Sequence, residues 1–159
     1  MFKGQEKHSR KKEVISVSAA DEVREASERF YAALNRMLNG NTAPLAGIWS
    51  HSATVTTMHP IGAREVGWDK VGQVWEQVAK VFSGGQVKLS DQLIQVSGDM
   101  AYEVGTERGQ AKLGGQQVAI EHRVTNIYRR GAEAWKIVHH HTDVSPAMVD
   151  ALSRLQANT

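Results

Sequence analysis

The stretch that decides the fold lies at residues 135–143 and reads W-K-I-V-H-H-H-T-D. Its aromatic and β-branched residues are typical of a buried strand, and three consecutive histidines follow them. Side chains of a strand alternate between two faces, so His140 points away from His139 and His141. Because imidazole titrates near neutral pH, the histidines that line a cavity are the ones able to act as acid, base or ligand.

The chain before this strand changes once from helical to strand periodicity. Apolar residues at helical spacing predict a long helix after the capping signal Ser18, a short one behind Thr42, and another from Asp69 to Phe82. A strand over Ala53–Met58 ends at the turn that Pro60 forces. Four more strands are predicted at Val87–Val96, Met100–Lys112, Gln117–Tyr128 and Trp135–Val144, and a short helix at residues 148–155.

Consecutive strands joined by short glycine turns form an antiparallel meander. Helices first and strands afterwards imply an α+β domain, in which a curled, cone-shaped antiparallel sheet wraps around two long helices and one short helix. We expect one domain over residues 18–145, a basic flexible tail at 1–17, and a short helix or tail at 146–159. The open end of such a cone is where a small ligand would bind.

Composition limits the classes of function. The 159 residues include no cysteine, which excludes disulfides and thiolate nucleophiles. The net charge of +2 comes from the tail, since residues 1–13 hold five basic and two acidic residues, so the domain offers no surface for nucleic acid. We find no secretory signal and no apolar run that could span a bilayer, so we expect a cytoplasmic protein without membrane contact.

Three stretches carry a family resemblance: A-A-L-N at 32–35, A-T-V-T-T-M-H-P-I-G at 53–62, and R-V-T-N-I-Y-R-R at 123–130 with W-K-I-V-H-H-H at 135–141. Together they resemble the nuclear transport factor 2-like superfamily, and within it the SnoaL-like and ketosteroid-isomerase-like proteins. The resemblance covers residues 18–145 and implies a cystatin-like roll. This superfamily hosts isomerases, cyclases, dehydratases, transport factors and oligomerisation hubs, so the fold alone does not define a reaction.

The resemblance to ketosteroid isomerases implies site residues. The position of their aspartate base, just before a proline, is occupied here by His59, which is either a proton acceptor in the pocket or a turn residue. The positions of their two oxyanion donors match Phe30 and Thr125. Phe30 can only contact a ligand, and the Thr125 hydroxyl is a weak donor, so steroid isomerisation is not expected.

The same resemblance implies which side chains face the cone. If Thr125 points inward, Arg123 does too, and His140 and Thr142 follow on the last strand; His140 is then a ligand contact or a core histidine. Arg108 matches a pocket arginine in the association domain of calmodulin-dependent kinase II. Inward arginines need a partner, either Glu103, Glu107 or Glu121 or a carboxylate-bearing ligand. Trp49 packs the core or stacks on a ligand at the mouth.

The remaining residues of the last strand would face outward. In this superfamily the outer sheet face commonly packs on a second subunit, so Trp135, Ile137, His139 and His141 imply a homodimer interface. His139 and His141 alone do not supply the three or four ligands that zinc requires, so we expect no metal. The sequence has no phosphate-binding glycine loop and no dinucleotide motif, so we expect no cofactor.

Two hypotheses about function remain open. The first is a cofactor-independent isomerase, cyclase or lyase with an apolar small-molecule pocket, in which His59 moves a proton next to a carbonyl and Thr125 steadies the developing charge. The second is a non-catalytic module that binds a small acid or forms dimers. The first hypothesis requires His59 inside the cavity, within reach of a ligand.

Overall fold

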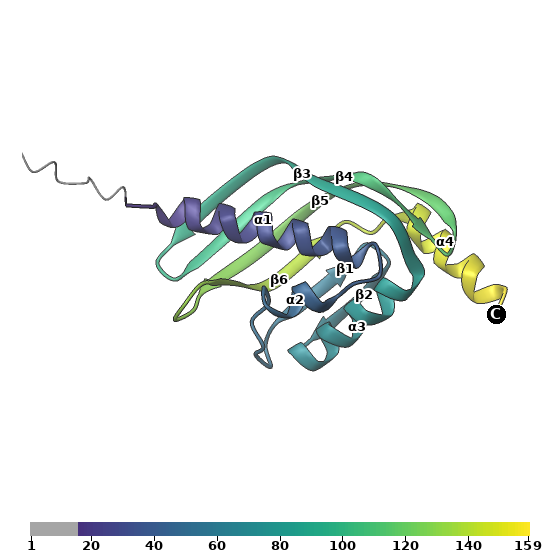
Figure 1. The fold of residues 1–159 in the computed structure, drawn as a ribbon, viewed down its shortest axis with the longest axis horizontal. Coiled ribbons are helices and arrows are strands. Elements are labelled where there is room, and N and C mark those ends of the chain that lie inside the picture. Colours follow the sequence, from purple (N-terminus) through teal and green to yellow (C-terminus); the bar gives the residue numbers. More distant parts are fainter. Residues whose placement is uncertain (1–15) are drawn as a thin grey trace, which may run out of the picture.

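The computed structural model describes residues 16–159, and Figure 1 shows how its elements are arranged. The helices are α1 (Ala19–Met37), α2 (Ala43–Ala46), α3 (Trp68–Val81) and α4 (Pro146–Ala157). The strands are β1 (Thr56–His59), β2 (Gly62–Val66), β3 (Phe82–Ser97), β4 (Met100–Leu113), β5 (Gln116–Arg130) and β6 (Trp135–Thr142). In residues 16–159, no helix combines the length and the apolar character that crossing a membrane requires. All but the last two residues of the predicted tail lie outside the described part of the chain.

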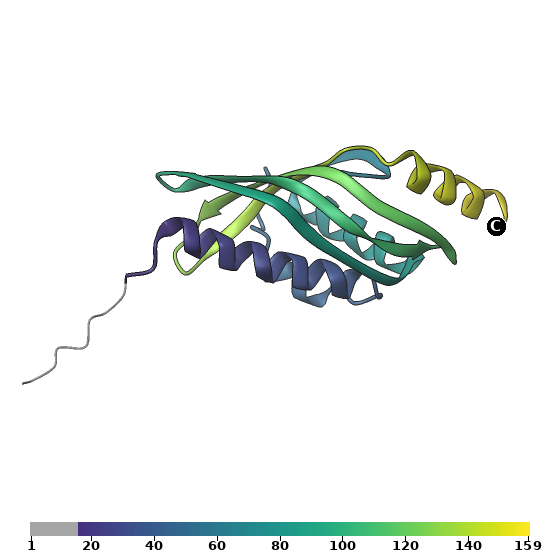
Figure 2. The ribbon, with the colours of Figure 1, turned by 90° about the horizontal axis from the view of Figure 1, so that it is seen from above.

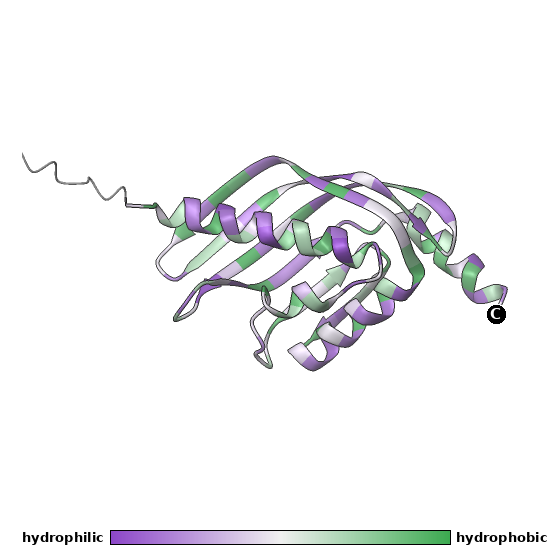
Figure 3. Ribbon diagram, viewed as in Figure 1, coloured by the Kyte–Doolittle hydropathy of each residue, from purple (hydrophilic) through white to green (hydrophobic). Residues whose placement is uncertain are grey.

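Helix α1 begins and packs as its sequence predicts. The Ser18 side chain accepts a hydrogen bond from the Asp21 backbone N–H at 3.1 Å and so caps the first turn. Val23, Phe30 and Met37 are buried along one stripe, and Figure 3 shows hydrophilic residues on the side of α1 that faces away from the sheet. The apolar stripe therefore fixes how α1 lies against the sheet.

The strands form one six-stranded sheet with the order β2-β1-β6-β5-β4-β3. The predicted antiparallel meander from β3 to β6 is confirmed, and β1 pairs with β2 in the same sense. Strand β1 also joins β6, in parallel, which places Thr57 beside His140. Figure 2 shows the sheet curling over α1 and α3, which confirms the α+β fold class.

A bulge in β6 changes which side chains face the helices. Tyr128 pairs with Ile137 while Ile127 pairs with His139, so one extra residue of β6 lies between them. Trp135 and Ile137 precede the bulge and are buried, and the expectation that they face outward is wrong. The residues after the bulge, His139 to Thr142, keep their predicted faces, because the extra residue restores the expected alternation.

Candidate functional site

A small cavity lies between α1, α3 and the inner face of the sheet, and the first turn of α4 closes it. Its volume is about 50 Å³, which is room for a few non-hydrogen atoms. The walls are apolar and include Leu34, Met37, Val78, Phe82, Ile120 and Met148. Four residues bring polar groups that can titrate: His59, Glu107, His122 and His140. The cavity therefore combines apolar walls with a cluster of histidines and one carboxyl group.

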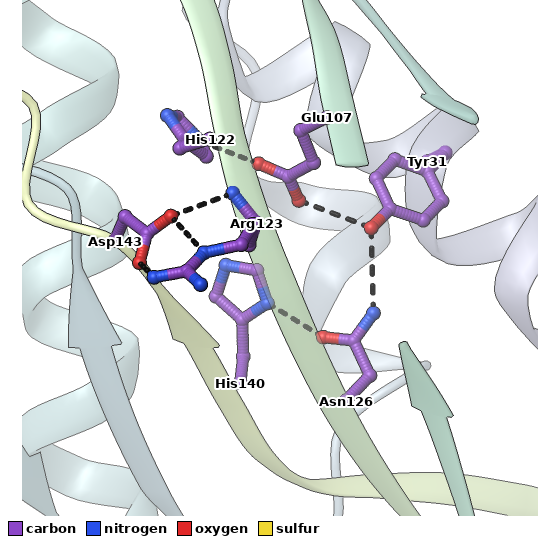
Figure 4. Close-up of polar contacts among 7 residues, drawn as sticks. All are labelled: Tyr31, Glu107, His122, Arg123, Asn126, His140 and Asp143. Atoms are coloured by element: carbon purple, nitrogen blue, oxygen red, sulfur yellow. Dashed lines mark hydrogen bonds and ion pairs between the residues drawn. The ribbon is translucent and has the colours of Figure 1, made fainter. Parts of the chain in front are cut away.

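His122 is held by a buried carboxyl group. Its Nε2 lies 2.7 Å from Oε2 of Glu107, and Tyr31 donates its hydroxyl to Oε1 of Glu107 at 3.0 Å (Figure 4). All three side chains are buried. Nδ1 of His122 is also buried, and it has no hydrogen-bond partner among residues 16–159. An imidazole oriented by a carboxylate, with its second nitrogen free, is the arrangement of a general base.

His140 is held by an amide instead. Its Nδ1 lies 2.7 Å from Oδ1 of Asn126, as Figure 4 shows. The Asn126 amide donates to Oε2 of Glu103 at 2.8 Å and lies 3.4 Å from the Tyr31 hydroxyl. These contacts fix the amide so that its oxygen faces His140. His140 therefore carries its proton on Nδ1 and leaves Nε2 as a hydrogen-bond acceptor.

Glu103, which is fully buried, accepts the hydrogen bond that orients the Asn126 amide toward His140. Besides the Asn126 amide, its carboxyl group accepts the Tyr128 hydroxyl at 3.0 Å and the Gln92 amide at 2.7 Å. Three donors around one buried carboxyl group replace the water it loses on folding. Burial raises the pKa of Tyr128 well above its ordinary value, so this hydroxyl stays protonated and continues to donate.

His59 lies in the cavity wall, as the enzyme hypothesis requires. Its ring packs edge-on against Trp75 with 4.6 Å between centroids, and its hydrogen-bond contact is the Thr57 hydroxyl at 3.5 Å. Burial lowers the pKa of His59 to about 4. Burial, with the charges of neighbouring histidines, also lowers the pKa of His140 well below its ordinary value. Both imidazoles are therefore neutral at pH 7.

The two arginines and the threonine expected inside the cone lie on the other face of the sheet. Arg123 is bound by both carboxylate oxygens of Asp143, at 2.9 and 3.0 Å, and Arg108 pairs with Asp91 at 2.9 Å. Thr125 follows Arg123 on that outer face, away from the cavity. The inward placement is wrong because the alternation of β5 buries Val118, Ile120, His122, Val124, Asn126 and Tyr128.

Three other predicted ligand contacts are buried beside the cavity. Phe30 packs against His140 with 5.2 Å between ring centroids, and Trp49 packs against Trp75 at 6.4 Å. Thr142 is buried, and its hydroxyl has no hydrogen-bond partner among residues 16–159. None of the three is among the residues that line the cavity.

Sequence reasoning missed Tyr31, Glu103, Glu107, His122 and Asn126 as a group. A signal for two of them exists, because Val118, Ile120, Val124 and Tyr128 share one parity along β5 and mark its buried face. That parity places His122 and Asn126 inside. The contact of Tyr31 with Glu107, 76 residues away along the chain, has no comparable local signal.

A wider groove of about 710 Å³ lies between α1 and the turn that joins β5 to β6. Among its charged groups, Glu22 and Arg130 pair with each other, and Glu22 also accepts a hydrogen bond from the Trp135 indole. In residues 16–159, no three His, Asp or Glu side chains are grouped to hold a metal ion. The histidine cavity holds an imidazole oriented by a buried carboxyl group, and it is the candidate functional site for this reason.

Comparison with known families identifies the class of protein. A sequence family described as SnoaL-like domain matches residues 23–148, and the chain therefore belongs to this family. No curated protein matches the chain. The structural neighbours below place it in the wider nuclear transport factor 2-like superfamily.

Solved structures with this fold are numerous. A candidate dehydratase of that superfamily from Streptomyces avermitilis is 26% identical, with a TM-score of 0.70, and the alignment covers 80% of this chain and 96% of the other. A superfamily protein from Salmonella enterica is 21% identical with a TM-score of 0.70, covering 79% and 89%. A candidate calcium/calmodulin-dependent protein kinase type II association domain from Thiobacillus denitrificans is 24% identical, with a TM-score of 0.59, covering 77% and 94%.

Proposed function

We propose that this protein is a cofactor-independent lyase or isomerase that removes a proton next to a carbonyl group in a small molecule. His122 is the base in this proposal. The observation that carries it is the buried contact of His122, a residue that lines an apolar cavity, with Glu107, while Nδ1 of His122 has no partner among residues 16–159. A buried polar atom without a partner needs an explanation, and a reacting ligand is one.

The reaction begins when Nδ1 of His122 takes a proton from the carbon next to the carbonyl. Glu107 stabilises the imidazolium that forms, because its carboxylate accepts a hydrogen bond from the Nε2–H group and carries the opposite charge. Trp75 lines the cavity, and its buried indole N–H has no partner among residues 16–159, so it can donate to the carbonyl oxygen as negative charge develops. His122 supplies proton transfer and Trp75 supplies charge stabilisation, without a metal or a cofactor.

The fate of that proton separates the two reaction classes. In an isomerase, His122 returns the proton to a different carbon. In a lyase, the electrons of the broken C–H bond form a C=C bond, the C–O bond to a β-hydroxyl breaks, and His122 returns the proton to the departing oxygen as water. The neighbour from Streptomyces avermitilis, a candidate dehydratase by name, supports the lyase. His59, the base expected from sequence, then acts as a neutral part of the wall.

The proposal is tested with 4-hydroxy-2-butanone, an uncharged β-hydroxy ketone. In heavy water, the wild type should speed both deuterium exchange at the carbon between the two groups and release of butenone, followed by NMR and by ultraviolet absorbance. His122→Gln should slow both by about 10²-fold or more, because general acid–base catalysis contributes roughly that factor.

The matched control for this experiment is His51→Gln, which changes an exposed histidine outside the cavity. It should react at the rate of the wild type. Equal rates for the wild type and His122→Gln would contradict the proposal, and so would a wild type that is no faster than buffer.

We also propose that the protein forms a homodimer through the outer face of the sheet. This face carries the exposed apolar residues Leu93 and Tyr102, with His139 and His141 beside them. Neighbours of the same fold include proteins named as an association domain and a hub of calmodulin-dependent kinase II, which supports assembly into an oligomer. Tyr102→Glu should convert a dimer to a monomer in sedimentation experiments, and a wild type that sediments as a monomer would overturn this proposal.

A further inference from the structure

We infer that the cavity accepts an uncharged ligand whose hydroxyl group donates a hydrogen bond to His140, and that it rejects a carboxylate. The inference rests on the proposed function, because it names the substrate class of the same site. It replaces the expectation of a carboxylate-bearing ligand, which depended on inward arginines.

The hydrogen-bond character of His140 is fixed by its neighbours. Glu103 accepts from the Asn126 amide, so the amide oxygen of Asn126 must accept from His140 Nδ1. The side-chain hydrogen bond of His140 within residues 16–159 is the one at Nδ1, so Nε2 keeps its lone pair for a ligand. A ligand meets an acceptor at this point, and a hydroxyl group supplies the donor that matches it.

The charges around the cavity exclude an anion. Glu107 is the carboxyl group in its wall, and no arginine or lysine of the described chain lines it. Arg108 and Arg123 are held on the outer face by Asp91 and Asp143. A carboxylate would therefore lose its water without gaining a counter-charge, which is costly in an apolar site.

The size of the cavity limits how much of the ligand is enclosed. About 50 Å³ holds a hydroxylated carbon with its immediate neighbours. Leu34, Val78 and Ile120 surround this space with hydrocarbon. The enclosed end of the ligand is therefore compact, apolar and hydroxylated, and it bears no formal charge.

Three matched compounds test this inference by NMR titration of the full chain: methyl 3-hydroxybutanoate, its 3-methoxy analogue and 3-hydroxybutanoate. The first is uncharged with a donor, the second lacks the donor, and the third carries the charge. The first should bind at least about tenfold more tightly than either of the others, since one buried unmatched group costs 1.4 kcal/mol or more. Its binding should shift the ring resonances of His140.

The variant Glu107→Gln tests whether the charge of the cavity wall, and not its shape, excludes a carboxylate. Glu107→Gln removes the carboxylate from the wall, so affinity for 3-hydroxybutanoate should rise about tenfold while that for the methyl ester changes little. His51→Gln should leave the preference unchanged. Equal or tighter binding of 3-hydroxybutanoate by the wild type would overturn the inference, as would no binding of the ester. The titration reports a dissociation constant whether or not the ester is converted, so failure of this test is distinct from failure of the proposed reaction.

Discussion

Two histidines of one cavity are held in opposite ways. A carboxyl group contacts Nε2 of His122, whereas an amide oxygen contacts Nδ1 of His140. The carboxylate of Glu107 stabilises the charged imidazolium, which suits a base, while the amide of Asn126 fixes a neutral ring, which suits a hydrogen-bond acceptor. The residue that contacts each imidazole, Glu107 or Asn126, therefore decides whether the ring acts as a base or as a hydrogen-bond acceptor.

The two supporting carboxyl groups also differ. Glu107 is contacted by a hydroxyl and an imidazole, and both can exchange donor and acceptor roles. Glu103 is contacted by two amide NH₂ groups and a hydroxyl. Because an NH₂ group can only donate, the neighbours of Glu103 require an acceptor at this position. The neighbours of Glu107 can instead reverse their hydrogen bonds, so they tolerate an amide in place of the carboxylate.

The largest expected effect follows from this difference and concerns Glu103→Gln. The new amide places an NH₂ group against existing donors at a fully buried site. We expect the free energy of unfolding to fall by about 3 kcal/mol, because buried donors are left without an acceptor. Urea denaturation measures this loss, and Glu121→Gln, at an exposed site on β5, is the matched control. A loss below that of Glu107→Gln would break the comparison.

Acid should destabilise the protein through the histidines that no carboxylate contacts. The pKa of His59 falls from 6.5 to about 4 on burial, so between these values the unfolded chain binds more protons than the folded one. The free energy of unfolding should be constant above pH 6.5 and fall by roughly 3 kcal/mol toward pH 4, and His140 acts in the same direction.

His59→Phe keeps an aromatic ring against Trp75 but removes the titrating group. Denaturation measured across this pH range should show a shallower loss in the variant. An unchanged pH dependence would show that His59 does not titrate with the shifted pKa.

Glu107→Gln should affect the reaction more than stability. The neutral amide cannot stabilise the His122 imidazolium, so deuterium exchange into 4-hydroxy-2-butanone should slow by about 10²-fold, equivalent to about 2.7 kcal/mol of barrier. Unfolding should become easier by only about 1 kcal/mol, because Tyr31 and His122 can adjust their hydrogen bonds. Full activity in this variant would show that contact with Glu107 does not make His122 the base.

The smallest effect is expected for Thr125→Ala on the outer face of β5. Thr125 lies away from the cavity, so the exchange rate should stay at the wild-type value and stability should change by less than about 0.5 kcal/mol. A large loss of activity would show that the outer face takes part in the reaction.

The sequence predicts the fold better than the site. The helix after Ser18 and the meander from β3 to β6 follow from local periodicity, and both are confirmed. The parallel pairing of β1 with β6 joins distant segments and carries no local signal. The faces of β6 depend on one extra residue at a bulge, which sequence alternation cannot reveal, and this reversed the expected places of Trp135 and Ile137.

The error on β5 has a different cause. The match of Thr125 to a donor position of ketosteroid isomerases disagrees with the strand's own alternation, in which Val118, Ile120 and Val124 mark the buried face. The alternation was the stronger evidence, because burial of apolar side chains determines strand orientation. The contact of Tyr31 with Glu107 depends on where α1 crosses the sheet, and local sequence patterns do not specify that position.

The most direct test of the account is a long-range ¹H–¹⁵N NMR spectrum of the histidine rings at pH 7. We predict opposite tautomers, with the His122 proton on Nε2 beside Glu107 and the His140 proton on Nδ1 beside Asn126. His140 should also remain neutral as the pH falls to 6. A protonated His140 at pH 7, or the same tautomer in both rings, would contradict the account.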